Sequence, residues 1–330
     1  MSEPFFSVVV PVFDAGRPLE RCLEALERSS FDSYELIVVD DGSSDDSAAI
    51  AARAGATVLQ TGGRRGPGRA RNLGAEVAEG RYLLFLDADC EVERATLERL
   101  ADALRSDPDL AAAFGSYDDQ PASSTFLSQY KNLQHHWVHQ SGRQEASTFW
   151  SGCGAVKRRV FLDLGGFDTR RYRRPSIEDI ELGYRLRAQG HRIRLVKDVR
   201  VKHHKRWGLA ALLKTDIFDR AVPWTQLMLE RGEMVDDLNV GTSSRLSGIA
   251  AWGVILALAA SFFDRRFLAV AVLFVGVLLV ANRSFYGFLL RERGPWFTLR
   301  AIPIHWLYYL YSVAAFAFAA VGHLVRRRST

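Results

Sequence analysis

Three acidic segments within the first 180 residues carry side chains that could do chemistry. They are Asp40-Asp41-Gly42-Ser43, Asp87-Ala88-Asp89 and Glu178-Asp179. The first two directly follow the apolar runs Glu35–Val39 and Tyr82–Leu86, which are typical of buried parallel strands. Ligands of open α/β sheets bind at the carboxyl ends of the strands, so these carboxylates predict a metal and nucleotide site.

Asp87 and Asp89 lie two residues apart at the end of a predicted strand. In extended geometry both carboxylates point to the same side, where they can hold one hard cation directly or through water. Mg²⁺ and Mn²⁺ prefer such oxygen ligands and bridge them to phosphates of a substrate. A pair of this kind also occurs in solvated loops, and its place at a strand end is what favours a metal site.

Asp41 could accept a hydrogen bond from a nucleotide base or ribose, while Gly42 gives the backbone freedom to turn. A helix-capping role for Asp40, Ser43 or Asp45 is an alternative, and the two roles are compatible. The glycines of 66–74 do not follow the first strand as G-x-G-x-x-G, which argues against a dinucleotide-binding oxidoreductase. Arg69 and Arg71, at the start of a predicted helix, are expected to pair with phosphates or carboxylates.

Asp179 begins a predicted helix over residues 179–189. A carboxylate at a helix start is often explained by the helix dipole alone. It is also the residue type that can remove a proton from a sugar hydroxyl within hydrogen-bond reach, so Asp179 is predicted to be a general base. Glu178 is expected to point elsewhere on the helix.

Strands and helices alternate through the first half of the chain, which indicates βαβ units around a mostly parallel sheet and an α/β fold. The pattern loosens from residue 111, where Ser123–Gln140 reads as a helix and Thr148–Val156 as a strand containing glycine. The predicted elements before that are strands at 7–13, 35–39, 56–60 and 82–86 and helices at 17–28, 45–54, 69–78 and 94–104.

The last third of the chain has a different composition. Three stretches, Leu246–Phe263, Phe267–Ala281 and Ile302–Val325, are almost free of charge and are bordered by Trp, Tyr and Arg. Two of them are long enough to cross a bilayer and the middle one is short, so two to three transmembrane helices are predicted, with a buried helical core as the alternative. Three spans would place Arg326–Arg328 outside, against the positive-inside tendency, which leaves the topology open.

Residues 207–231 mix apolar and basic side chains, as in an amphipathic helix lying on a membrane and broken at Pro223. An ordinary packing helix between domains is the alternative. The N-terminus has no apolar signal segment, and the three cysteines are widely spaced, so the first 200 residues are expected to face the cytoplasm.

The net charge is only +5, but several basic residues are clustered. The clusters lie beside acidic motifs or predicted spans, not among base-stacking aromatics, which argues against a nucleic-acid partner. Anionic lipid headgroups or phosphates of a substrate are the favoured partners, with a solvated face as the simpler alternative. The clusters are Arg170-Arg171 with Arg173-Arg174, His203–Arg206 and Arg326–Arg328.

Six motifs in this order resemble the inverting family-2 glycosyltransferases of GT-A fold over roughly residues 5–205. They are Pro11-Val12-Phe13, Asp40–Ser43, Gly68–Gly74, Asp87–Asp89, Gly165–Asp168 and Glu178–Leu182. The resemblance implies that Asp41 contacts the nucleotide base, with Pro11 and Phe13 beside it. It further implies that Asp87 and Asp89 hold Mg²⁺ or Mn²⁺ on the donor diphosphate and that Asp179 is the base. By a looser transfer, His203 or His204 would make another metal or phosphate contact.

The chain departs from two branches of that family. Processive members such as cellulose and hyaluronan synthases carry Q-x-x-R-W after the base, whereas this chain has Arg220-Ala221-Val222-Pro223-Trp224. Addition of a single sugar is therefore expected in place of polymer synthesis. Dolichyl-phosphate mannose synthases share the first half but lack the segment Gly165–Asp168.

Together these features predict a GT-A domain over residues 1–206, an amphipathic interfacial linker over 207–244 and a transmembrane region over 245–330. The predicted protein is a multi-pass enzyme of the cytoplasmic membrane that moves one sugar from a nucleotide-diphosphate sugar to a lipid-linked or glycolipid hydroxyl. Two alternatives stay open: a polyprenyl-phosphate glycosyltransferase, and a non-catalytic nucleotide-sugar-binding subunit of an envelope polysaccharide assembly.

Overall fold

The computed structural model describes residues 3–232 and 241–328, with side chains as far as Val325. The chain forms two compact units, Met1–Arg206 and Trp207–Thr330, and each is described here by itself. Part of the predicted linker 207–244 and the side chains of Arg326–Arg328 lie outside the described residues.

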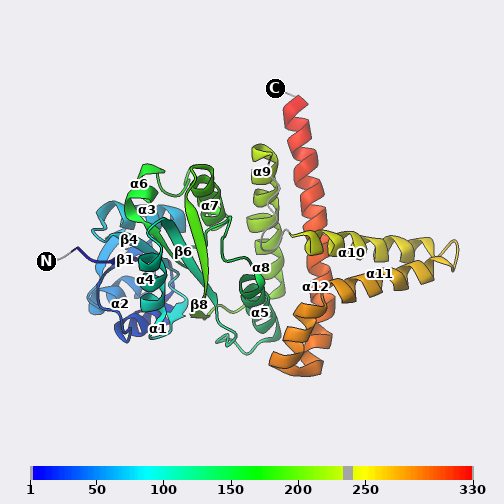
Figure 1. Ribbon diagram of the computed structural model, residues 1–330, viewed down its shortest axis with the longest axis horizontal. Helices are drawn as coiled ribbons and strands as arrows, with labels where there is room; N and C mark the ends of the chain where they lie inside the picture. The colour runs from blue at the N-terminus through cyan, green and yellow to red at the C-terminus, as the bar shows by residue number, and fades with distance from the viewer. Residues whose placement is uncertain (1–2, 233–240, 329–330) are drawn as a thin grey trace. The chain divides into compact units, whose positions relative to one another are not determined.

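The first unit is built on one eight-stranded sheet with strand order β3-β2-β1-β4-β7-β6-β8-β5 (Figure 1). Neighbours from β3 to β4 are parallel, and so are β6 and β8, whereas β7 runs against β4 and β6, and β5 runs against β8. The strands are β1 (Phe6–Val12), β2 (Tyr34–Asp40), β3 (Thr57–Gln60), β4 (Tyr82–Leu86), β5 (Cys90–Val92), β6 (Leu110–Tyr117), β7 (Cys153–Lys157) and β8 (Arg192–His203). The α/β class is confirmed, and the sheet is mixed.

Helices cover both faces of this sheet and bury the apolar stripes that the sequence pattern indicated. The leucines of α1 and α4 pack on one face, and alanines and leucines of α3 and α7 pack on the other. The helices are α1 (Gly16–Glu27), α2 (Ser47–Arg53), α3 (Pro67–Val77), α4 (Thr96–Ser106), α5 (Phe126–Ser141), α6 (Arg158–Asp163) and α7 (Glu178–Ala188).

The strand predicted over Thr148–Val156 begins only at Cys153. The preceding residues leave the sheet and pack against α7, where a Cβ atom on Gly183 would lie 2.4 Å from the backbone nitrogen of Phe149. This close backbone approach needs a glycine in the helix, and it brings residues 148–152 to the start of α7.

In the part that the structure describes, the second unit consists of helices joined by short turns. It contains α8 (Leu209–Lys214), a π-helical segment η1 (Thr215–Ala221), α9 (Val222–Arg231), α10 (Thr242–Ala260), α11 (Phe267–Ala281) and α12 (Arg283–Arg328). The expected break at Pro223 is wrong, because the helical path runs from 209 to 231. The wider turns of η1 precede the proline, which lacks an N–H for the regular ladder. Helix α12 is kinked at Gly294, which has φ 79°.

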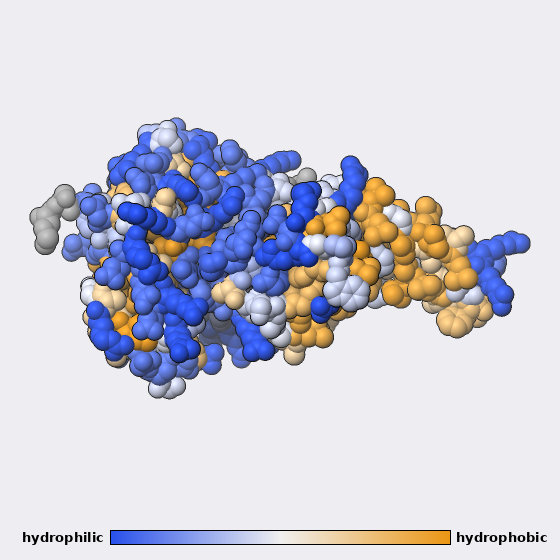
Figure 2. Space-filling model, turned by 90° about the horizontal axis from the view of Figure 1, so that it is seen from below, coloured by the Kyte–Doolittle hydropathy of each residue, from blue (hydrophilic) through white to orange (hydrophobic). Residues whose placement is uncertain are grey.

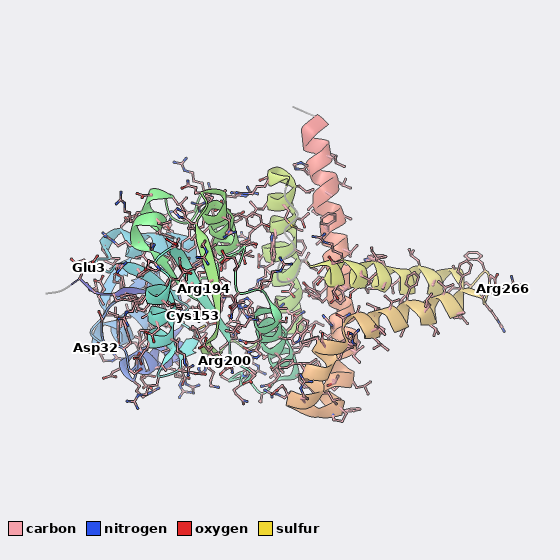
Figure 3. The ribbon with its side chains drawn as sticks, viewed as in Figure 1. Glu3, Asp32, Cys153, Arg194, Arg200 and Arg266 are labelled. Carbon is pink, nitrogen blue, oxygen red and sulfur yellow. The ribbon has the colours of Figure 1, made fainter. Side chains whose placement is uncertain are left out.

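Helices α10 and α11 form a hairpin with Arg266 at its tip (Figures 1 and 3). Apolar side chains cover the outside of the hairpin, and charged residues gather at the tip (Figure 2). Phe262 and Phe263 are at least 90% exposed. Two helical segments, 242–260 and 283–325, are long and apolar enough to cross a membrane, and α11 is a shorter apolar helix.

A polar cluster joins the three helices inside this unit. Asn282 donates to the Ser247 hydroxyl (3.0 Å) and accepts from the Tyr309 hydroxyl (2.7 Å). These side chains come from α10, from the junction of α11 and α12, and from α12, and all three are buried. Hydrogen-bonded polar side chains of this kind hold apolar helices in one arrangement.

Candidate active site

The predicted acidic segments meet at the carboxyl edge of the parallel strands. Asp40 ends β2 opposite Val12 of β1, and Asp87 follows directly after β4, which also pairs with β1. Asp40 is buried and accepts a hydrogen bond from the Ser43 backbone (2.9 Å), which fixes the turn at Gly42. The parallel register thus places the two segments on neighbouring strand ends.

Arg71 on α3 joins two of the acidic segments. Its Nη2 donates to Asp87 Oδ1 at 2.7 Å and its Nη1 donates to Glu178 Oε1 at 3.2 Å. Arg71 and Glu178 are both buried, and Arg71 Nε is buried without a hydrogen-bond partner among the described residues. Burial alone would lower the pKa of Arg71, but the two carboxylates raise it, so the guanidinium stays charged.

The two acids beside Arg71 have perturbed pKa values. Burial raises the pKa of the Asp87 carboxyl. The charge of Asp89 raises it further, whereas Arg71 lowers it without cancelling the rise. Burial also raises the pKa of Glu178 above its usual range, again against the effect of Arg71. Glu178 was expected to point elsewhere on the helix. Instead its carboxylate reaches the cluster, and it also accepts from the Ser176 backbone (2.9 Å).

Asp89 is held on its other side by His203 of β8. Their Oδ2 and Nε2 atoms are 3.4 Å apart, and the imidazole stacks on Tyr117 with ring centroids 4.1 Å apart. Burial alone would raise the pKa of Asp89, but His203 and Lys205 hold it below its usual range. The Asp89 carboxylate is therefore ionised at neutral pH.

The donor set around Asp87 and Asp89 fits a hard divalent cation. Ligand atoms of Asp87, Asp89 and Cys90 lie within 4.8 Å of one another. Burial raises the pKa of Cys90 well above its usual range, so its thiol stays protonated and the useful ligands are the two carboxylates. Oxygen ligands of this kind suit Mg²⁺ or Mn²⁺, with the remaining positions left to water and phosphate.

Asp179 lies at the first turn of α7 and is held by the segment that precedes β7. Its Oδ2 accepts from the Ser151 backbone N–H (3.0 Å) and from the Ser151 hydroxyl (3.2 Å). The next residue, Gly152, accepts a hydrogen bond from the Asp87 backbone (3.1 Å). Residues 151–152 therefore connect Asp179 to the end of β4, and the Asp179 charge is close enough to raise the pKa of Asp87.

Both oxygens of the buried Asp41 carboxylate are bonded to the loop over residues 61–66. Oδ1 accepts from the Thr61 hydroxyl (2.7 Å) and the Arg65 backbone (2.8 Å), and Oδ2 accepts from the Gly66 backbone (2.7 Å). The Arg64 guanidinium lies 4.1 Å from the ring centroid of Phe13. This loop thus covers both Asp41, which was predicted to contact the base, and Phe13, which was predicted to lie near it.

The other predicted residues are placed as follows. Pro11 is buried in β1 opposite Val39. Arg69 does not join the carboxylate cluster, because its exposed side chain pairs with Glu76 at 3.4 Å. His204 pairs with Glu91 at 2.8 Å, whereas His203 lies at Asp89. The roles assigned to Pro11, Arg69 and His203 stay predictions.

Sequence reasoning missed the supporting residues Glu178, Ser151 and Tyr117. Glu178 carried a usable signal, since two adjacent acids at a helix start diverge by about 100° and one of them can face the sheet. Ser151 and Tyr117 carried none, because their contacts to Asp179 and His203 depend on tertiary packing.

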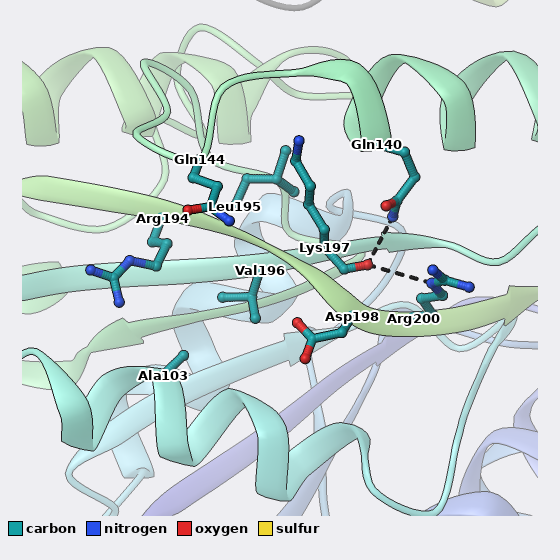
Figure 4. Close-up of a pocket in the computed structure, with 9 residues that line it drawn as sticks. All are labelled: Ala103, Gln140, Gln144, Arg194, Leu195, Val196, Lys197, Asp198 and Arg200. Carbon is teal, nitrogen blue, oxygen red and sulfur yellow. Dashed lines mark hydrogen bonds between the residues drawn. The ribbon is translucent and has the colours of Figure 1, made fainter.

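A separate cavity of about 440 Å³ lies beside β8, and none of the predicted site residues lines it (Figure 4). Gln140 of α5 and Arg200 both donate to the Lys197 carbonyl there, at 2.8 and 3.4 Å. The cavity follows a bulge, since residues 196–199 of β8 face a single residue, Gly115, of β6. Its lining comes from β8, from Ala103 of α4, from Gln140 of α5 and from Gln144.

Comparison with known proteins agrees with this geometry. The family described as Glycosyl transferase family 2 matches residues 7–165. An uncharacterized protein of Mycobacterium tuberculosis, MT1568, is 28% identical over 221 residues, which cover 62% of this chain and 68% of that protein. The uncharacterized glycosyltransferase YibD of Escherichia coli is 37% identical over 121 residues, which cover 32% of either protein.

A solved structure with the same fold is the mannosyltransferase PcManGT of Pyrobaculum calidifontis in complex with GDP-Man and Mn²⁺. The TM-score is 0.57 at 18% identity, and the alignment covers 98% of this chain and 88% of the other. At this identity the likeness shows the fold alone, which is GT-A.

Proposed function

Because residues 7–165 of this chain belong to glycosyl transferase family 2, we propose that it transfers one sugar from a nucleotide-diphosphate donor to a hydroxyl of a membrane-associated acceptor. The acceptor is a lipid-linked sugar or a glycolipid, and the anomeric carbon is inverted. One observation carries this proposal: Arg71 bridges Asp87 and Glu178, which directly precedes Asp179. A leaving-group site and a base are thereby fixed next to each other.

The donor nucleotide uses the edge formed by β1 and β2, where Pro11, Phe13 and Asp41 lie. Asp87 and Asp89 would hold Mg²⁺ or Mn²⁺, which when bound would supply positive charge for the leaving diphosphate. The unpartnered Nε–H of Arg71 adds a donor for a phosphate oxygen. His203 keeps Asp89 oriented and makes a further contact to the metal or to a phosphate.

Asp179 acts as the general base. Two hydrogen bonds from Ser151 hold one of its oxygens, which fixes the carboxylate without neutralising it. The carboxylate accepts the proton of the acceptor hydroxyl while the hydroxyl oxygen attacks the anomeric carbon from the face opposite the leaving diphosphate.

Membrane attachment through the second unit is part of this proposal. Only 28% of the apolar window in α10 and 17% of that in α12 is buried within the protein, which is low for core helices of a soluble protein. Exposed apolar surface on this scale needs a lipid or protein cover. The catalytic unit, with its three buried free cysteines, faces the cytoplasm.

The test is transfer from a panel of radiolabelled nucleotide sugars to bacterial lipid extract by the full chain, compared with the Asp179→Asn variant. With a hydroxyl acceptor, loss of the base lowers single-turnover transfer by roughly a hundredfold to ten-thousandfold while donor binding persists. Asp163→Asn on α6 is the control and leaves transfer unchanged, because Asp163 is exposed and pairs only with Arg159 among the described residues.

A loss below tenfold with unchanged donor binding would contradict the base assignment. A polyprenyl phosphate is already anionic and needs no base, so that result would favour a polyprenyl-phosphate acceptor. Donor binding without transfer to any acceptor would favour the non-catalytic subunit.

A further inference from the structure

Six exposed arginines lie on two loops of the first unit, and the carboxylates that border these loops, Asp41 and Asp168, accept hydrogen bonds from the loop backbone. We call this set the arginine rim: Arg64 and Arg65 of the loop 61–66, and Arg170, Arg171, Arg173 and Arg174 of the loop 169–176. A surface that only keeps a protein soluble mixes charges of both signs. The rim concentrates one sign on two short loops.

The two loops contact each other. Gly66 has φ +94°, and a Cβ atom there would lie 2.7 Å from the Arg173 carbonyl oxygen. The first loop is anchored on Asp41 through Arg65 and Gly66, and Arg64 lies over Phe13. The rim is therefore continuous across both loops and borders the proposed nucleotide site.

The second loop leads directly into the helix that carries the base. The Ser176 backbone donates to Glu178, and the Asp168 carboxylate accepts from the backbones of Arg170 (3.1 Å) and Arg171 (3.0 Å). Asp168 is thus used for backbone support within this turn. The loop ends three residues before Asp179, so its arginines are close in the sequence to the proposed base.

The rim matches the chemistry of a second phosphate group. Planar guanidinium groups bind phosphate oxygens bidentately and with charge assistance. In the proposed function the donor diphosphate is already bound by the cation on Asp87 and Asp89 and by Arg71. A neutral glycolipid would offer the rim nothing to bind.

We propose that the arginine rim binds the diphosphate linker of the acceptor, so that the acceptor class is a sugar linked to a lipid through a diphosphate. This inference rests on the proposed function and narrows its acceptor.

The experiment compares the double variant Arg173→Gln/Arg174→Gln with a control, Arg53→Gln/Arg159→Gln, which loses the same charge at exposed sites on α2 and α6. Two acceptors with the same terminal sugar are used in zwitterionic vesicles, one linked through a diphosphate and one neutral. The rim variant should raise the KM for the diphosphate acceptor roughly tenfold to thirtyfold, with donor KM unchanged. Added salt should likewise raise the KM of the unmodified protein for the diphosphate acceptor.

Binding is measured separately, without donor, by calorimetric titration of the full chain in zwitterionic detergent with polyprenyl diphosphate. Loss of this binding in the rim variant but not in the control supports the rim, even if no sugar transfer occurs and the proposed function fails. Arg170→Gln/Arg171→Gln provides a second variant on the loop 169–176, outside the loop that covers the nucleotide site.

Three results would overturn the inference. They are an equal effect of the rim variant on the KM for both acceptors, a rise in donor KM with no change in acceptor KM, and binding of an ordinary anionic phospholipid that is as tight as binding of polyprenyl diphosphate and equally weakened in the rim variant. The last outcome would identify the rim as a membrane-docking surface.

Discussion

Replacing Arg71 by glutamine tests the bridge between Asp87 and Glu178. Without the guanidinium, Glu178 is a buried carboxylate that has lost its ion pair, and it can avoid that cost by taking up a proton. For a glutamate whose ordinary pKa is 4.5, protonation at pH 7 costs at most about 3.4 kcal/mol, at about 1.36 kcal/mol per pH unit. At pH 5 the same limit is about 0.7 kcal/mol.

The sign of the pH dependence follows from the raised pKa of Glu178. The native variant holds a proton that the unfolded chain releases above the ordinary pKa, so its free energy of unfolding falls as the pH rises. In the unmodified protein Arg71 opposes that rise. The difference in stability between the two proteins should therefore be large at pH 7 and small at pH 5.

The assay is thermal unfolding of the full chain in a zwitterionic detergent at both pH values. A unit of this size loses roughly 2–4 °C of Tm per kcal/mol, so the decrease should reach several degrees at pH 7. Adding Glu178→Gln to the variant should recover most of it, because position 178 then has no carboxylate to be protonated. Arg69→Gln, an exposed neighbour on the same helix, should change Tm by little.

A decrease of equal size at pH 5 and pH 7 would refute this reasoning. So would a double variant no more stable than Arg71→Gln alone, since either result would mean that Arg71 contributes through packing and not through its charge.

Three further predictions concern the metal, the packing against α7 and the second unit. Asp89→Ala should lower transfer by on the order of a hundredfold or more, and full activity of the unmodified protein in EDTA would contradict the metal role. Gly183→Ala should lower Tm, because the new Cβ would meet the Phe149 backbone at 2.4 Å. Replacing glycine by alanine within a helix otherwise stabilises by about 0.5–1 kcal/mol, so a raised Tm would show that the segment containing Phe149 moves aside. Ending the chain after Arg206 should preserve donor binding in calorimetry but strongly reduce turnover on a membrane acceptor, which the second unit keeps concentrated nearby, and unchanged turnover would argue against anchoring.

Much of the fold could be predicted because its elements follow local patterns. The strand at Tyr82–Leu86 was predicted with its observed bounds, and the helices of the first half differ from prediction by a few residues at their ends. The three-residue β5 could not be predicted, since it exists only through its pairing with β8, more than 100 residues later. The π-helical turns before Pro223 likewise result from packing within the second unit, which a proline rule does not include.

The residues of the candidate site likewise fall into those that the sequence could indicate and those that depend on tertiary contacts. Asp41, Asp87 and Asp89 were recognisable because each lies at or just after the end of an apolar strand. The contacts that orient the site were not, since Arg71 and Glu178 are separated by 107 positions in the sequence. Residue type and spacing indicate which groups can react, whereas their partners depend on how distant helices meet.

The three hydrogen bonds between Asp41 and the loop 61–66 also bear on kinetics. If the nucleotide base uses Asp41, as proposed, the donor and the loop compete for one carboxylate. Part of the intrinsic donor affinity is then used to open the loop, so the measured affinity is lower than that of an already open site. The same competition favours turnover at the other end of the cycle, because the loop that closes again on Asp41 helps to displace the spent nucleotide.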